Sequence, residues 1–256
     1  MINKKEIFLN FEEDDRALVL NLYEKLRLAL DRDITTFGND FYPPNVWSYF
    51  QNKVKIENFN IESFGFFEES ERRMISFNNI YNVEFPMKII KIEKTSKFNK
   101  VSHRDYLGAI LSLGIKRSKF GDLIVQDDFC YVALCEEIED YIIDNLKSIG
   151  KSPCRVTKIK NIVEVPSIDF KEEVILVQTL RVDSIVSKIA KVSRSQAQEM
   201  IEEGRVLVDY NRVKEKSKEV KTDERITVRG IGKFILGNII GKSKSDKYKV
   251  IIKKYT

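Results

Sequence analysis

Residues 193–197 read Ser-Arg-Ser-Gln-Ala, and their side chains are suited to hold an anion. Ser193 can cap the start of a helix, with Gln196 supplying the reciprocal hydrogen bond three residues later. Arg194, Ser195 and Gln196 would then project from the first turn, where free backbone N–H groups and the helix dipole already favour negative charge. A guanidinium, a hydroxyl and an amide at this place predict a phosphate-binding site.

The helix that presents these side chains is expected to end at Gly204 and to bury Ala197, Met200 and Ile201. The elements around it follow from apolar periodicity. They are a helix at 184–191, short strands at 206–208, 220 and 226–228, and a closing hairpin of 234–240 and 248–253.

Charge separates this part of the chain from the rest. The 256 residues carry 44 Lys and Arg against 39 Asp and Glu, a formal net charge of +5. Residues 1–179 hold 25 basic and 29 acidic groups, whereas residues 180–256 hold 19 and 10. The net charge is therefore −4 in the body and +9 in the C-terminal part, which indicates a polyanionic partner for the latter.

At these residues the chain resembles the S4 RNA-binding domain. The family has an Arg-Leu-Asp opening, a Ser-Arg-x-x-Ala helix start, a Leu-Ile-x-x-Gly helix end, Val-x-Val, and Gly-Asp before the last strand. The matching segments here are Arg181-Val-Asp183, residues 193–197, Met200-Ile201-Glu-Glu-Gly204, Val206-Leu-Val208, Lys216-Ser217 and residues 222–228. Asp209-Tyr210 replaces the common Asn-Gly and Thr222 replaces Gly, so the departures lie in turns.

The resemblance implies a set of RNA-binding residues. They are Arg181, Lys188, Ser193, Arg194, Ser195, Gln196, Arg205, Lys216, Lys218, Arg229 and Lys233. For the last four, solvated surface charge is an equally good interpretation. Lys116 and Arg117, in the middle of the chain, are candidates for a second RNA contact or for ordinary loop charges.

The middle of the chain predicts a β-α-β-β-α-β order, the split βαβ arrangement of ferredoxin-like and RRM-like domains. The expected elements are a strand at 85–93, a helix from Ser102 to Gly114, a hairpin of 122–126 and 129–134, a helix at 136–149 and a strand at 154–159. Phe129 and Tyr131 alternate on one strand, as residues that stack on bases would, and core packing explains them equally well.

The first 76 residues predict a small helical unit. A helix at 11–32 has apolar residues at helical spacing, and Asn45 can cap a short helix after Pro43-Pro44. Aromatic residues between 59 and 67 are expected mostly in the core. The fold class is thus α+β, with an N-terminal helical unit at 1–76, a ferredoxin/RRM-like domain at 77–160, a connector at 161–179 and an S4 domain at 180–256.

Over nearly its whole length the chain resembles YlmH-type proteins. The residues are His103-Arg-Asp-Tyr-Leu-Gly108, Leu113-Gly-Ile-Lys-Arg117, Gly121-Asp122 and Arg229-Gly-Ile-Gly-Lys-Phe234. The resemblance implies non-catalytic binding of structured RNA, namely large-subunit rRNA and tRNA. It further implies a place on the large ribosomal subunit with peptidyl-tRNA, in ribosome-associated quality control, and a link to cell division.

An S4-bearing RNA-modifying enzyme, such as a pseudouridine synthase-like protein, is the alternative, but no Gly-Arg-Leu-Asp-like run occurs. His103-Arg104-Asp105 lacks the other kinase signatures. A scaffold whose basic end meets acidic protein or lipid is a third possibility. With one histidine, three cysteines and no apolar run of about 18 residues, we expect no catalytic residue, cofactor, metal, membrane or DNA partner, and a cytoplasmic location.

Overall fold

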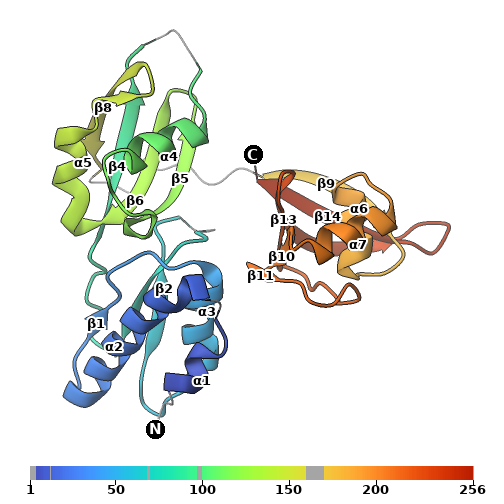
Figure 1. Ribbon diagram of the computed structural model, residues 1–256, viewed down its shortest axis with the longest axis horizontal. Helices are drawn as coiled ribbons and strands as arrows, with labels where there is room; N and C mark the ends of the chain where they lie inside the picture. Colours follow the sequence, from blue (N-terminus) through green and yellow to red (C-terminus); the bar gives the residue numbers. More distant parts are fainter. Residues whose placement is uncertain (1–3, 12, 68–69, 97–99, 160–169, 256) are drawn as a thin grey trace. The chain divides into compact units, whose positions relative to one another are not determined.

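The computed structural model describes residues 4–11, 13–67, 70–96, 100–159 and 170–255. The chain divides into two compact units, Met1–Ser167 and Ile168–Thr256 (Figure 1). Both units combine helices with sheets, which confirms the α+β class.

The beginning of the first unit contains helices and a small sheet. The helices are α1 (Lys4–Phe8), the 3-10 turn η1 (Glu13–Asp15), α2 (Arg16–Arg32) and α3 (Pro44–Lys53). Three short strands, β1 (Thr36–Phe37), β2 (Ile61–Phe64) and β3 (Met74–Phe77), form an antiparallel sheet in the order β1-β3-β2, which the sequence did not predict. The apolar stripe of α2 packs into one core with Ile75 and Phe77.

The start of α3 differs from the expectation. Pro43 precedes the helix and Pro44 occupies its first turn, where the missing N–H costs nothing. Asn45 therefore lies inside the helix, and its Nδ2 donates to Asp15 Oδ2 at 2.7 Å instead of capping.

The middle domain has the expected ferredoxin-like order. Its elements are β4 (Met87–Lys94), α4 (His103–Leu111), η2 (Arg117–Lys119), β5 (Phe120–Gln126), β6 (Phe129–Cys135), η3 (Glu136–Ile138), α5 (Glu139–Asn145), β7 (Ser148–Ile149) and β8 (Ser152–Lys158). The sheet runs β5-β6-β4-β8-β7, and neighbouring strands are antiparallel. Helices α4 and α5 share a core with one face of this sheet.

Two boundaries in this domain depart from the predicted ones. The capping box of Ser102 and Asp105 is present, but α4 ends at Leu111, three residues before the predicted Gly114. The second helix stops at Asn145, because residues 148 and 149 pair with β8 through a turn at Gly150, whose φ is +57°.

Asp122 of β5 connects the middle domain to the N-terminal part. Its Oδ2 accepts hydrogen bonds from the backbone N–H groups of Glu71 and Arg72, at 2.6 and 3.1 Å. Arg72 in turn donates to the carbonyl oxygen of Phe41 at 2.6 Å. These bonds explain why residues so distant in sequence belong to one compact unit.

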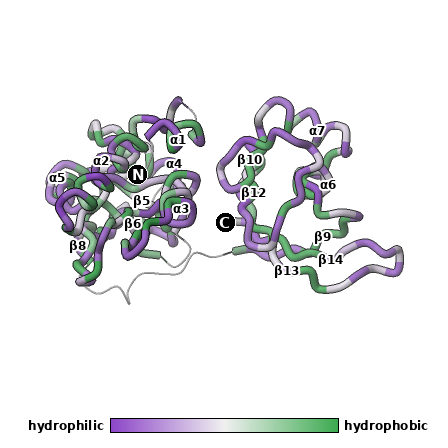
Figure 2. The backbone as a smooth tube through the Cα atoms, turned by 90° about the horizontal axis from the view of Figure 1, so that it is seen from below, coloured by the Kyte–Doolittle hydropathy of each residue, from purple (hydrophilic) through white to green (hydrophobic). Residues whose placement is uncertain are grey.

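The second unit packs two helices against a six-stranded sheet. Its elements are β9 (Phe170–Val177), α6 (Val182–Ile189), α7 (Arg194–Glu202), β10 (Val206–Val208), β11 (Asn211–Arg212), β12 (Arg225–Val228), β13 (Gly232–Lys242) and β14 (Tyr248–Tyr255). The strand order is β11-β10-β12-β13-β14-β9. Figure 2 shows hydrophilic residues along much of α7 and at the tip of the β13–β14 hairpin.

Strand β9 is an addition to the predicted domain. The sequence placed residues 161–179 in a connector, yet 170–177 pair with β14 along the whole strand. The sequence did not predict this strand because its first half contains the charged run Lys171-Glu-Glu173 instead of an apolar pattern. These charged residues are exposed, as is common on the edge strand of a sheet. Residues 161–169 of the expected connector lie outside the described residues.

Candidate nucleic-acid interface

The start of α7 is fixed by the capping box that the sequence predicts. Ser193 Oγ accepts from the backbone N–H of Gln196 at 3.2 Å, and Gln196 Oε1 accepts from the backbone N–H of Ser193 at 3.0 Å. Each of these two side chains therefore uses one oxygen to fix the helix start. Arg194 and Ser195 follow in the first turn and are exposed.

A buried carboxylate organises the cations near this helix start. Asp183 of α6 is fully buried, and it accepts hydrogen bonds from two guanidinium groups. Arg194 Nε and Nη2 reach its two oxygens at 3.0 and 3.2 Å, and Arg181 does so at 3.3 and 3.2 Å. Gln198, one turn along α7 from Arg194, donates to the same carboxylate at 2.9 Å.

This arrangement changes the acidity of Asp183. Burial alone would raise the pKa of its carboxyl, but the hydrogen bonds from Arg194, Gln198 and Arg181 outweigh burial and hold the pKa below its usual value. The carboxylate is thus ionised at neutral pH and can orient both guanidiniums. Because the side chains of Arg181 and Arg194 remain 36% and 47% exposed, each guanidinium still presents N–H groups to solvent.

A second group of the expected residues lies beyond the C-terminal end of α7. The backbone N–H of Arg229 donates to the carbonyl oxygen of Arg205, and Arg205 Nη2 reaches the carbonyl oxygen of Arg229 at 3.4 Å. Lys216 forms an ion pair with Glu202 in the last turn of the helix. Glu202 comes eight positions after Arg194 on the helix, a rise of about 12 Å along the axis.

The remaining expected cations lie apart from these groups. Lys188 is exposed in the last turn of α6. Lys218 is exposed in a loop, and its carbonyl oxygen accepts a hydrogen bond from the backbone N–H of Val182 at the start of that helix. Lys233 on β13 places its ammonium 5.4 Å from the ring centroid of Tyr210. The structure therefore brings Arg181 and the Ser193–Gln196 turn together at Asp183 and distributes the other expected residues over the rest of the domain.

The two expected middle-domain cations differ from each other. Lys116 is exposed, whereas Arg117 donates to the carbonyl oxygens of Phe120 and Gly121 at 2.6 and 3.1 Å and lies over the Phe120 ring. Burial, together with the neighbouring charge of Arg72, lowers the pKa of Arg117 to about 10. Arg117 thus uses its guanidinium inside the protein, which favours a structural role.

Sequence reasoning missed Asp183, which holds the two guanidiniums, and Gln198, which donates to the same carboxylate. Asp183 was seen only as part of the opening Arg-x-Asp motif, and Gln198 was not singled out. The spacing of Arg194 and Gln198, four residues apart on one helix face, is the signal that could have found the pair. The lysine-rich tip of the β13–β14 hairpin also lay outside the expected set: Lys242, Lys244, Lys247 and Lys249.

The described residues offer little for metal or thiol chemistry. Within them, no group of three or more His, Cys, Asp or Glu side chains could hold a metal ion. Burial raises the pKa of Cys135 to about 12 and also raises the pKa values of Cys130 and Cys154, so the thiols are poor nucleophiles. No helix in the part of the chain that the structure describes is long and apolar enough to cross a membrane.

Comparison with known proteins gives two domain matches. Residues 81–162 match the family described as "Putative RNA-binding domain in YlmH", and residues 180–226 match the S4 domain. Ribosome-associated protein quality control protein P2 of Bacillus subtilis (strain 168) is 26% identical over 254 residues, which cover 97% of this chain and 98% of that protein.

A solved structure supports the fold. Cell division protein ylmH from Streptococcus pneumoniae matches with a TM-score of 0.50 at 22% identity, over 61% of this chain and 97% of that chain. RNA binding, rather than catalysis, is the activity that both matched domain families indicate. With these two domains in this order, and a relative aligned along almost its full length, the chain belongs to the YlmH-type S4-domain proteins.

Proposed function

We propose that this protein binds structured RNA through its S4 domain without catalysing a reaction. Its partners are large-subunit rRNA and tRNA, and its place is the large ribosomal subunit carrying peptidyl-tRNA, in ribosome-associated quality control in the cytoplasm. The name of the Bacillus subtilis relative supports the quality-control assignment.

The observation that most directly supports RNA binding is the pair of guanidiniums that Asp183 holds beside the first turn of α7. Two half-exposed arginines meet at Asp183 beside the N-terminal turn of α7, which also carries the exposed Ser195, in a domain with excess positive charge. Such a surface fits the phosphates of an RNA backbone, because backbone N–H groups and guanidiniums both donate to phosphate oxygens.

Crosslinking in cells, followed by sequencing of the bound RNA, tests this function. We expect the wild-type protein to recover large-subunit rRNA and tRNA, and the Arg194→Gln variant to recover several-fold less of both. Arg32→Gln, an exposed arginine of the first unit, is the matched control and should recover as much as wild type. Recovery of scattered mRNA alone would contradict the proposal.

A further inference from the structure

Among the residues that the structure describes, no helix packs on one face of the middle-domain sheet near the β5–β6 turn. Helices α4 and α5 pack against Ile90, Ile92, Cys130 and Val132, so the alternate residues of β4 and β6 point to the opposite face. Cross-strand pairing sets these residues in two rows. Lys91 lies between Tyr131 and Thr157, and Glu93 lies between Phe129 and Arg155.

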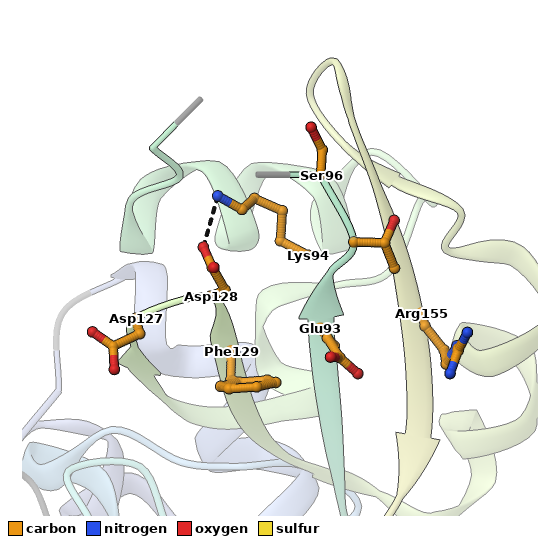
Figure 3. Close-up of a pocket in the computed structure, with 8 residues that line it drawn as sticks. Glu93, Lys94, Ser96, Asp127, Asp128, Phe129 and Arg155 are labelled. Atoms are coloured by element: carbon orange, nitrogen blue, oxygen red, sulfur yellow. Dashed lines mark ion pairs between the residues drawn. The ribbon is translucent and has the colours of Figure 1, made fainter. Parts of the chain in front are cut away.

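A pocket of about 340 Å³ lies at the end of these rows (Figure 3). The strand ends of β4, β6 and β8 and the Asp127-Asp128 turn contribute its walls. The lining residues are Glu93, Lys94, Thr95, Ser96, Asp127, Asp128, Phe129 and Arg155. Figure 3 shows them distributed around the ends of the strands rather than along one element.

The charges of the pocket are unevenly compensated. Lys94, whose side chain is 4% exposed, forms an ion pair with Asp128 at 2.7 Å. Among the described residues, the side chains of Glu93, Asp127 and Arg155 have no hydrogen-bond or ion-pair partner. The residues that line the pocket include three carboxylates and two cations, and this excess of negative charge favours a neutral ligand that donates hydrogen bonds over a free phosphate.

An aromatic ring and a second cation complete the site. Phe129 is partly exposed and lines the pocket, and Lys91 Nζ lies 3.7 Å from its ring centroid and 5.8 Å from that of Tyr131. Lys91 covers one face of the Phe129 ring, and a planar base can stack on the other face, as nucleobases do on the aromatic side chains of sheet surfaces. Lys91 and Arg155 can then reach the phosphates of the same strand.

We propose that this pocket binds one unpaired guanine of an RNA strand, with the base against Phe129 and its Watson–Crick edge on Glu93. Guanine presents two adjacent donors there, N1–H and N2–H, which match the two oxygens of one carboxylate. Adenine and cytosine place an acceptor beside their amino group, and uracil places a carbonyl on each side of its N–H. The edge is available only in an unpaired base, so the ligand is single-stranded.

This inference rests on the proposed function in taking RNA as the partner, but it concerns a different site. The pocket lies at the Gln126 end of β5, whereas Lys116 and Arg117 precede its Phe120 end. The open end of the sheet, rather than the loop before β5, is therefore the second RNA contact that the structure favours.

Binding of labelled hexamers to the full-length protein, followed by fluorescence anisotropy, tests the proposal. The strands are hexauridine with one central guanosine or one central inosine, which lacks only the N2 amino group. We expect the guanosine strand to bind about tenfold more tightly, and Glu93→Gln to remove most of this difference. Glu57→Gln, an exposed residue of the N-terminal part, is the matched charge control and should preserve it.

Phe129→Leu should weaken both strands about tenfold, since the stacking surface is lost. Thermal unfolding of each variant establishes that it is folded, and Arg155→Gln, at an exposed position, provides a second variant that should weaken both strands. Equal affinity of wild type for the two strands, or a preference for guanosine that survives Glu93→Gln, would overturn the proposal.

The Arg194→Gln variant separates this site from the S4 domain. It should keep the guanosine preference while losing affinity for structured RNA. If the preference is absent but Arg194→Gln still weakens structured RNA, the pocket assignment fails and the proposed function stands. If the preference is present while structured RNA binds both proteins equally, the S4 assignment fails instead.

Discussion

Asp183 illustrates how one buried residue can control an exposed surface. It carries no accessible area itself, yet it fixes the position of two arginines that face solvent. A guanidinium held in this way loses less conformational freedom when it meets phosphate than a free side chain does. The carboxylate therefore contributes to RNA binding through preorganisation, without touching RNA.

Replacing Asp183 by Asn should lower both stability and affinity. The variant retains one acceptor but leaves two guanidiniums without their compensating charge, so we expect a loss of about 2 kcal/mol in the free energy of unfolding. Urea denaturation followed by circular dichroism measures this loss. RNA affinity should fall as well, while its salt dependence stays unchanged, because both cations remain. A reduced salt dependence would instead indicate that an arginine no longer contacts phosphate.

The same carboxylate predicts a dependence of stability on pH. Because its folded-state pKa is lowered, its contribution to stability is complete above its unfolded value of about 3.9 and is lost as pH falls through the lowered folded value. We expect the difference in unfolding free energy between wild type and Asp183→Asn to be constant from pH 7 to 5 and to shrink below pH 4. Urea denaturation at each pH tests this, and a constant difference down to pH 3 would contradict it.

At the scale of elements, the β10–β11 turn retains strain where S4 domains often have Asn-Gly. Asp209 and Tyr210 both have positive φ, at 45° and 65°, the backbone of a type I′ hairpin turn. Contacts of both side chains offset this backbone strain. Asp209 Oδ1 accepts a hydrogen bond from the backbone N–H of Arg225 at 2.9 Å. The ring of Tyr210 lies beneath the ammonium group of Lys233.

Two substitutions at Tyr210 separate the ring from the backbone. Both Tyr210→Ala and Tyr210→Gly remove the contact with Lys233, but only glycine adopts a positive φ without a steric cost. We expect the glycine variant to be more stable than the alanine variant by about 1 kcal/mol in chemical denaturation. Equal stability would show that the turn rearranges once the ring is gone.

Elements with strong local signals were predictable, and those fixed by long-range pairing were not. The capping boxes at Ser102 and Ser193, the β5–β6 hairpin and the apolar stripe of α2 are all encoded within a few residues. Strands β1 and β9, by contrast, exist because distant partners pair with them. At the site, the capping box was predictable, whereas the hydrogen bonds that Arg194 donates to Asp183 depend on how α6 and α7 pack.

At the scale of the whole molecule, the two compact units differ in charge. Residues 1–167, which include the middle domain, have a net charge of −2, and residues 168–256, which include the S4 domain, have a net charge of +7. Non-specific attraction to RNA should therefore arise from the second unit. On the proposal made above, the first unit contacts RNA through a specific site, the Glu93 pocket, because its net negative charge supplies no general attraction to RNA.

This division predicts how salt acts on binding of structured RNA. Each phosphate contact releases counterions, so the slope of log affinity against log salt counts the contacts. Arg194→Gln should reduce the magnitude of that slope by about one, whereas Arg32→Gln on α2 should leave it unchanged. The double variant Lys244→Gln, Lys247→Gln provides the third comparison, at the tip of the β13–β14 hairpin, where Lys244 is exposed and Lys247 is partly exposed. An unchanged slope for this double variant would confine the phosphate contacts to the helix face, and a slope reduced by about two would extend them to the hairpin.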